Sequence, residues 1–305
     1  MRLLWREVEN CPEAREIFSK QKPDGSWLAG GSWAQKPAYV PKDGYTAFTP
    51  KYVTAAWIVP ILGGMGFSAG DVRVAKACDY MLSFHWPNGW FDRFKIRHGD
   101  LCDSYMGEFP DNNPCDLSVY LTAFGSVGMA ADSRLRPSWD LLVKWQREDG
   151  GWINQKHKEE RNWTRSCPAV TGGAVAALFH SSDPGHKAPL RRGLEFLVWH
   201  LSTKDDVEIR RFFYHGHKMV KEMLMLSETG VGVSQRPVRV VLDWLMTMYE
   251  QGEGCFRYKG KPISKYTWHQ DAAEPRTLKY VLYHVIEDDW LTYYMTRIAA
   301  NLAAR

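Results

Sequence analysis

The stretch "WDLLVKWQREDGGW" (residues 139–152) joins a helix signal to a tight turn. Large apolar residues recur at helical spacing up to Trp145, and a pair of glycines then interrupts the pattern before Trp152. A glycine after the last periodic residue often ends a helix, because it adopts a positive φ without steric penalty. The stretch therefore predicts an amphipathic helix, a glycine turn and an aromatic residue that folds back over the helix end.

The same pattern occurs five times along the chain, at intervals of 48 to 63 residues. Each copy begins with an acidic residue, continues with large apolar residues, and reaches an aromatic or apolar residue 11 to 13 positions later. The acidic residues are Glu16, Asp79, Asp140, Glu195 and Asp243, and the residues at the far end are Trp27, Trp90, Trp152, Val207 and Phe256. Such self-similarity indicates a repeat protein whose units bury their apolar faces against one another.

A second helix is expected after each of these turns. The segments concerned are 50–62, 115–128, 167–179, 211–226 and 274–286. The first three are rich in small and apolar residues with few charges, as expected of helices that are buried on most sides. With outer helices over 3–19 and 287–304 closing the two ends, we predict one all-α domain over 1–305. Its five to six helical hairpins would form a closed (α/α)6-type toroid with inner and outer helix layers.

The repeated sequence motif resembles that of a known superfamily. Residues 21–27 ("QKPDGSW") and 146–152 ("QREDGGW") resemble the QW repeats of squalene-hopene cyclases and protein prenyltransferase β-subunits, and 85–90 and 251–256 resemble degenerate copies. The similarity spans about residues 10–285. It implies an (α/α)6 toroid whose inner helices line a deep apolar cavity for an isoprenoid. It also implies a structural motif, so we expect the glutamine amide to satisfy helix-end backbone groups and the indole to pack between hairpins.

Composition limits the other classes of protein. The chain of 305 residues is 45% hydrophobic and 24% charged, which is typical of a globular protein with a large core. Its net charge of +4 comes without a basic stripe, so we expect no nucleic-acid partner. The chain has no apolar run long enough for a transmembrane helix and no secretory signal, and its six cysteines lack CxxC spacing. These features predict a cytoplasmic protein with reduced cysteines, and they leave peripheral membrane contact and the oligomeric state open.

The resemblance implies where an acid would lie. Class II terpene cyclases protonate an alkene with a DxDD motif at the head of an inner helix. Laid over residues 113–116, this motif retains only Asp116, and Cys115, a weaker acid, occupies the position that carries the proton. An apolar cavity raises the pKa of a carboxyl group, which would let Asp116 donate a proton. The catalytic candidates are Asp111, Cys115, Asp116 and Glu274, and helix capping stays open as the role of Glu274.

A zinc site is the second kind of chemistry that the resemblance implies. Protein prenyltransferases hold zinc with an Asp-x-Cys pair and a distant histidine, and "HGDLCDSY" (98–105) supplies Asp100 and Cys102 in that spacing. His269 is the third ligand that we select. The other candidate histidines are His98, His215 and His217. A cofactor is therefore either absent or zinc, and a purely structural role for these histidines and cysteines stays open.

The connections from outer to inner helices are long, and on a ring of hairpins they meet at one end. These connections are 28–48, 92–112, 153–166 and 257–273. Loops of that length are often functional, and their aromatic residues would bind substrate through their π faces or pack the loops onto the scaffold. The expected substrate-binding residues are Trp33, Tyr105, Trp163, His215, His217 and Trp268.

Three functions are consistent with these patterns. The first is an atypical terpenoid cyclase or prenyltransferase acting on an isoprenoid or a similar apolar lipid. The second is a catalytically degenerate toroid that binds an apolar ligand or a partner. The third is a carbohydrate-active (α/α) barrel, either a lyase or a hydrolase. The QW motifs favour the cyclase or transferase and the degenerate toroid over the carbohydrate-active barrel. The incomplete DxDD motif favours the degenerate toroid over the cyclase.

Overall fold

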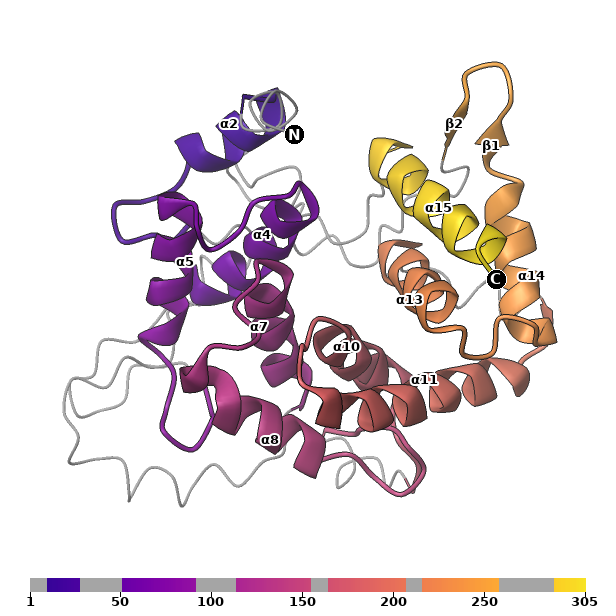
Figure 1. The fold of residues 1–305 in the computed structure, drawn as a ribbon, viewed down its shortest axis with the longest axis horizontal. Helices are drawn as coiled ribbons and strands as arrows, with labels where there is room; N and C mark the ends of the chain where they lie inside the picture. The colour runs from indigo at the N-terminus through magenta and orange to yellow at the C-terminus, as the bar shows by residue number, and fades with distance from the viewer. Residues whose placement is uncertain (1–9, 28–50, 92–113, 155–163, 207–215, 258–287) are drawn as a thin grey trace.

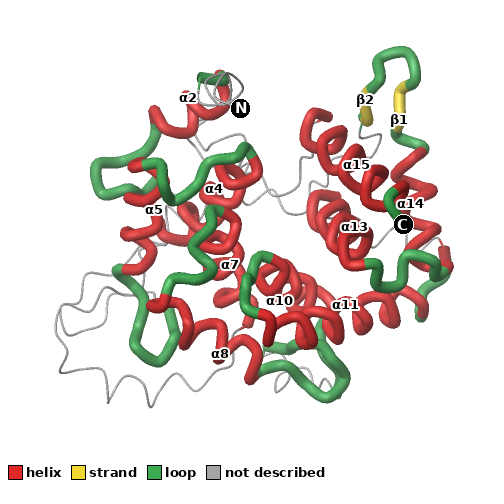
Figure 2. The backbone as a smooth tube through the Cα atoms, in the orientation of Figure 1, coloured by secondary structure: helices red, strands yellow, loops and turns green. Residues whose placement is uncertain are grey.

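The computed structural model of the chain describes residues 10–27, 51–91, 114–154, 164–206, 216–257 and 288–305 (Figures 1 and 2). This part of the chain is mostly helical and contains two short strands, which confirms the all-α prediction. The strands β1 (Tyr249–Glu250) and β2 (Cys255–Phe256) pair with each other as an antiparallel hairpin.

Helices of two kinds alternate along the chain. The more apolar ones are α4 (Lys51–Gly64), α7 (Pro114–Ser126) and α10 (Pro168–Phe179), and α13 (Gly216–Thr229) takes the same place in the order but is itself amphipathic. The amphipathic ones are α2 (Pro12–Ser19), α5 (Val72–Leu82), α8 (Arg136–Lys144), α11 (Lys187–Ser202), α14 (Arg236–Met246) and α15 (Asp288–Ala303). The short 3-10 helices η2 (Ser133–Leu135) and η3 (Pro184–His186) lead into α8 and α11. The expected inner helix over 274–286 lies outside the described residues.

The helices form two layers. Inner helices α4, α7, α10 and α13 contact one another in that order, and α5, α8 and α11 each pack on the inner helix that precedes them. Helix α14 contacts α11, and α15 contacts α13. In Figure 1 the inner helices follow an arc, and α5, α8, α11 and α14 lie on its outer side.

Small residues set the approach of the inner helices. A Cβ on Gly173 of α10 would lie 3.5 Å from the Ser118 Cβ of α7, and one on Gly125 would lie 2.5 Å from the Cβ of His180. These two contacts show that α7 and α10 run parallel. A Cβ on Gly63 would lie 2.5 Å from the Ser126 carbonyl oxygen, which places the C-terminal ends of α4 and α7 together. The N-termini of α4, α7 and α10 therefore share one end of the layer, where the long connections were expected to enter.

The two intact QW turns form the same set of contacts. Trp152 is 0% exposed, and its Nε1–H donates to the Leu142 carbonyl at 2.8 Å. The Nε2–H of Gln146 donates to the carbonyl of Gly150 inside the turn and to that of Pro189 in α11, both at 2.8 Å. The amide thus joins one outer helix end to the start of the next, as the resemblance implied.

The first copy repeats these contacts 125 residues earlier in the chain. The Trp27 indole donates to Ile17 at 2.8 Å, and the Gln21 amide donates to the carbonyls of Gly25 at 3.1 Å and Arg73 of α5 at 2.9 Å. We call this arrangement the QW clamp: a glutamine that bonds to the next outer helix, a glycine turn, and a tryptophan that bonds to the preceding helix end. The predicted structural role of the motif is confirmed for both copies.

The turn glycine is required because two backbones touch. Gly150 has φ +85°, and a Cβ there would lie 2.7 Å from the Arg192 carbonyl oxygen of α11. Gly25 has φ +89°, and a Cβ there would lie 2.3 Å from the Lys76 carbonyl oxygen of α5. Any side chain at either position would both strain the turn and push the next outer helix away.

The second copy corrects our alignment. The sequence alignment predicts Trp90 in the tryptophan position, but the buried ring is that of Phe91, which is 3% exposed. Phe91 follows Gly89 by two residues, as Trp152 follows Gly150. Trp90 is half-buried and meets Trp145 edge-on. His85 takes the place of the glutamine: its Nε2 lies 2.9 Å from Ser138 Oγ, which donates to the Gly89 carbonyl at 2.7 Å. A histidine and a serine therefore replace one glutamine amide.

The last two copies are looser. In the fourth, an exposed ion pair joins Asp206 to Arg236 at the start of α14, while Val207 lies outside the described residues. In the fifth, Phe256 is buried at the end of the β1–β2 hairpin, and its N–H donates to Thr292 Oγ1 of α15 at 2.8 Å. Each still links one outer helix to the next, but through the Asp206 carboxylate or the Phe256 backbone in place of a glutamine amide.

Replacing Trp152 by alanine should lower the free energy of unfolding by about 3–5 kcal/mol, because the substitution leaves a cavity between helices and an unpaired Leu142 carbonyl. Trp199→Ala on α11 is the control, since Trp199 is 40% exposed and should lose about 1 kcal/mol or less. Urea denaturation measures both. Equal losses in the two variants would contradict the structural role of Trp152.

Three glycine-to-alanine substitutions separate the cost of a positive φ from the cost of a clash with a neighbouring backbone. Gly150→Ala should lower the free energy of unfolding by about 2 kcal/mol or more. The alanine would be held at a positive φ, and its Cβ would clash with a backbone carbonyl. Gly128→Ala, with φ +84° and open space around it, should cost about 1 kcal/mol. Gly252→Ala, with open space and no positive φ, should cost about 0.5 kcal/mol or less. Thermal and urea unfolding would give the series. A cost for Gly150→Ala no larger than that for Gly128→Ala would refute the contact.

Candidate functional site

One side of each inner helix is left partly exposed. Along α4, α7 and α10, the partly exposed and exposed residues recur every three or four positions, while the rest of each helix is largely buried. Nine residues make up this surface, which we call the inner face: Trp57, Ile61, Gly64, Cys115, Val119, Thr122, Ala169, Gly173 and Ala176. Neighbouring inner helices and the outer layer cover the remaining sides, so the inner face is the side turned away from the outer layer. None of its nine residues carries a charge.

Two of the predicted catalytic residues lie at the edge of this face. Cys115 and Asp116 are in the first turn of α7, and both are half-buried. Cys115 is the first inner-face residue of its helix. The positive end of the α7 dipole favours an ionised carboxylate in this turn, whereas the proton donor that we expected needs an apolar surrounding. Asp116 lies at the end where the inner helices begin, and its role as an acid stays a prediction.

The other predicted site residues are not described by the structure. Asp111, Glu274, Trp33, Tyr105, Trp163, His215, Trp268, Asp100, Cys102 and His269 all lie outside the described residues. His217 belongs to the first turn of α13, but its side chain is also outside the described part. Of the predicted catalytic residues, the structure therefore describes only Cys115 and Asp116, which are adjacent in sequence, and the wider constellation stays a prediction.

The predicted zinc site is not tested by the described residues. In that part of the chain, no three histidine, cysteine or acidic side chains are grouped as metal ligands. Asp100, Cys102 and His269 all fall in the segments that are left out, so zinc stays a prediction that depends on them.

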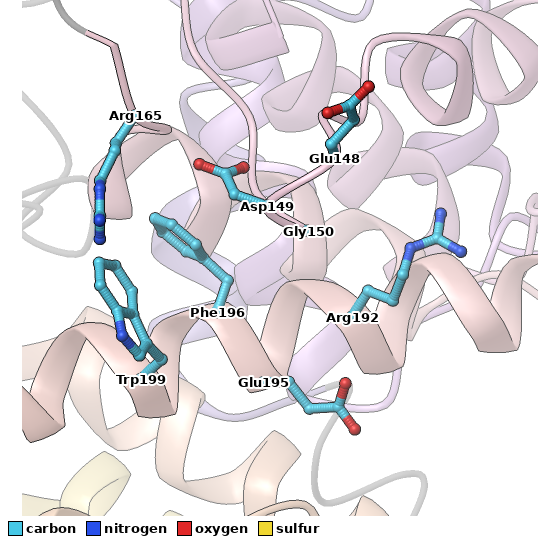
Figure 3. Close-up of a pocket in the computed structure, with 8 residues that line it drawn as sticks. All are labelled: Glu148, Asp149, Gly150, Arg165, Arg192, Glu195, Phe196 and Trp199. Carbon is cyan, nitrogen blue, oxygen red and sulfur yellow. The ribbon is translucent and has the colours of Figure 1, made fainter.

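A pocket of about 330 Å³ lies in the outer layer, between the QW turn of the third copy and α11 (Figure 3). Its lining consists of Glu148, Asp149, Gly150, Arg165, Arg192, Glu195, Phe196 and Trp199. Figure 3 shows the Arg165 side chain pointing at the indole of Trp199, with its Cζ 4.7 Å from the ring centroid. Sequence patterns gave no indication of this pocket.

Three charged groups of this pocket, those of Asp149, Arg192 and Glu195, already have structural partners. Burial raises the pKa of Asp149, but hydrogen bonds from Ser166 and Gly151 outweigh it and leave the pKa lowered. The Ser166 hydroxyl donates to Asp149 at 2.6 Å, and Arg192 donates to the Gln146 amide oxygen. Glu195 pairs with Arg191 at 2.9 Å. These contacts brace the QW clamp, so we do not assign chemistry to the pocket.

Two titratable groups of α10 and α13 had no place in the predicted site. Lys221 of α13 is half-buried, and desolvation lowers its pKa to about 8. His180, the C-cap of α10, is exposed as a residue, yet desolvation of its ring is the main cause that lowers its pKa to about 4, ahead of the charges of Lys221 and Arg297. In the sequence, Lys221 looks like an ordinary solvated charge of an amphipathic helix, so only the packing distinguishes it.

No protein-family model matches the chain. None of the helices in the described ranges is long and apolar enough to cross a membrane.

The histidine of the second QW copy should make stability depend on pH. Burial, with a smaller contribution from Arg134, lowers the pKa of His85 to about 4 from 6.5. Its contribution is therefore fully present above pH 6.5 and is lost as the pH falls towards 4, because the unfolded chain takes up the proton first. The expected loss at pH 4 is roughly 2–3 kcal/mol.

His85→Gln restores the consensus and removes this titration. Urea unfolding at pH 7 and pH 4.5 measures the effect, and His180 contributes equally to both proteins and cancels. The wild type should lose more stability than the variant over this interval. If both lose the same amount, burial does not hold His85 neutral in the folded chain.

Proposed function

We propose that the chain is a closed (α/α) toroid of the squalene-hopene cyclase and prenyltransferase type that binds an isoprenoid or a similarly apolar lipid against its inner face. The observation that carries the proposal is the chemistry of this face: its nine residues along three neighbouring helices are at least partly exposed and uncharged, and the charged Asp116 lies at its edge. A surface of this kind on a soluble domain is typical of sites that bind apolar molecules.

The repeated geometry supports the resemblance on which the fold rests. The two strict QW spellings form the same hydrogen bonds, to equivalent places in α5 and α11. When each repeat packs on the next through the same contacts, the rotation between successive repeats is similar, and the helix layer curves evenly. Such an arc favours closure into a ring over an open stack, and a closed ring places the inner face around a central cavity.

The incomplete acid motif favours binding over ordinary cyclisation. Asp116 is the one carboxylate at the DxDD place, and Cys115 next to it is a far weaker acid. We keep catalysis as a proposal for Asp116 alone, in which it protonates an alkene of the bound lipid. The carbohydrate-active alternative gains no support from the described residues, because they place one carboxylate, that of Asp116, at the edge of the inner face, whereas glycoside hydrolysis uses a pair.

Filling the inner face tests the proposal. Ala176→Trp adds an indole to the middle of that face on α10. Ala188→Trp makes the same change at an exposed position of α11 in the outer layer and serves as the control. Native mass spectrometry and calorimetry with farnesol and squalene should show binding by the wild type and by Ala188→Trp, and at least about tenfold weaker binding by Ala176→Trp. Thermal unfolding checks that both variants are folded.

Equal affinity of both folded variants would place any lipid site elsewhere. Absence of binding by the wild type to either probe, and of any co-purified lipid in an organic extract, would refute the proposed function as a whole.

Asp116→Asn tests the catalytic part. Incubation with squalene or geranylgeranyl diphosphate, followed by gas chromatography with mass spectrometry, detects cyclised or rearranged products. If Asp116 is the acid, the amide variant should keep lipid affinity and lose turnover by about 100-fold or more. Unchanged turnover would remove Asp116 from catalysis. A wild type that binds lipid but yields no product would assign the chain to the binding proteins.

A further inference from the structure

Two cavities adjoin along the exposed side of α11. The first is the pocket of about 330 Å³ beside the QW turn of the third copy. The second, of about 340 Å³, is lined by α11 and by residues of the loop 230–235, which leads into α14. Glu195 and Trp199 line both cavities, so the two meet at these side chains. We call the joined space the outer groove.

The outer groove follows the axis of α11. Its lining on this helix runs from Arg191 to Ser202, a distance of roughly 16 Å at about 1.5 Å per residue. Within this stretch Arg191, Glu195, Trp199 and Ser202 are all exposed and follow one another at steps of four, four and three. Residues at such spacing share one side of a helix. The groove therefore suits an extended ligand better than a single small ring.

Trp199 lies where the two cavities meet. Its side chain is 40% exposed, and the hydrogen bonds of the QW clamp come from Gln146 and Trp152 instead. The indole meets the Phe196 ring with 5.6 Å between centroids, and Arg165 Cζ lies 4.7 Å from its centroid. These contacts hold the indole in place while part of it stays open to the groove. Trp199 thus offers a rigid, flat surface to a ligand.

The groove carries both signs of charge in equal number. Its lining holds the carboxylates of Glu148, Asp149 and Glu195 and the guanidinium groups of Arg165, Arg191 and Arg192. In Figure 3 Arg165 lies at one end of the first cavity and Arg192 at the other, so these groups are spread along the groove. An even balance favours neither a cation nor an anion, and burying charged groups under an apolar chain is costly. Hydroxyl groups both donate and accept, so they match carboxylates and guanidinium groups alike.

We infer that the outer groove binds a neutral oligosaccharide, with one sugar ring on Trp199 and the neighbouring rings in the two cavities. The C–H face of a sugar ring packs on the indole, and its hydroxyl groups bond to the charged groups beside it. The structural partners of these groups leave room for this, because a carboxylate accepts about four hydrogen bonds and a guanidinium donates about five. The inference concerns binding without a reaction. It lies in the outer layer and does not depend on a lipid at the inner face.

Calorimetry on the full chain tests the inference. The probes are maltohexaose, cellohexaose and chitohexaose, and glucose and N-acetylglucosamine are the single-ring controls. The wild type should bind at least one hexasaccharide, about tenfold or more tightly than the matching monosaccharide. Trp199→Ala should weaken this binding by at least about tenfold. Thermal unfolding checks that each variant is folded.

Tyr293→Ala on α15 is the matched control. Tyr293 is 42% exposed and also lies beside an arginine, with Arg297 Cζ 5.8 Å from its ring centroid, but it lines neither cavity of the groove. Its removal should leave the affinity for the hexasaccharide unchanged. Ala176→Trp, which fills the inner face, should also leave it unchanged. A loss in Ala176→Trp would place the sugar at the inner face and overturn the inference.

Other outcomes contradict the groove or the class of ligand. Absence of wild-type binding to all of the hexasaccharides, or equal affinity of Trp199→Ala, overturns the inference whatever farnesol and squalene show. A neutral ligand should bind equally well at about 50 mM and about 500 mM salt, because screening acts on charges. A tenfold loss at the higher salt would show that the groove recognises a charged molecule instead.

Discussion

The QW clamp of the third copy is the contact on which the rest of the structure depends, because it holds three helices at once. The Gln146 amide bonds to the start of α11, and the Trp152 indole bonds to the end of α8. The Trp152 backbone N–H donates to Thr171 Oγ1 of α10 at 3.0 Å, and its carbonyl accepts from the Cys167 N–H at 2.8 Å. One turn thus fixes an outer helix, the inner helix that follows it and the next outer helix.

This arrangement explains how a motif without chemistry shapes a binding surface. A Cβ on Gly193 of α11 would lie 2.8 Å from the Trp152 ring and 2.5 Å from Val175 of α10, so the indole fills the space between layers. The buried groups of the clamp hold the helices together, whereas the inner-face residues pack against the core on one side and stay partly exposed on the other. Burial distinguishes the structural residues from the binding surface. The clamp tryptophans Trp27 and Trp152 are about 0–1% exposed, whereas the inner-face residues are partly exposed.

The sequence predicted the helices and the clamp because both depend on local spacing. The helical period, the glycine with positive φ and the distance from Gln146 to Trp152 are all readable along one segment. The prediction at Trp90 was wrong because it followed the residue type. The buried side chain is that of Phe91, so the distance from Gly89 decides which residue is buried there. Lys221 and the partnership of His85 with Ser138 were not predictable in this way, because each depends on packing between segments distant in sequence. The acid and metal residues of the long connections stay predictions.

Hydrogen exchange of the tryptophan indole N–H groups, followed by nuclear magnetic resonance, tests the clamp most directly. The Nε1–H groups of Trp27 and Trp152 bond to backbone carbonyls at 2.8 Å in a fully buried setting. They should therefore exchange only through unfolding of the whole domain, with a free energy close to that from urea denaturation. Trp199, at 40% exposure, should exchange faster by several orders of magnitude. Exchange of Trp27 and Trp152 as fast as that of Trp199 would contradict the account.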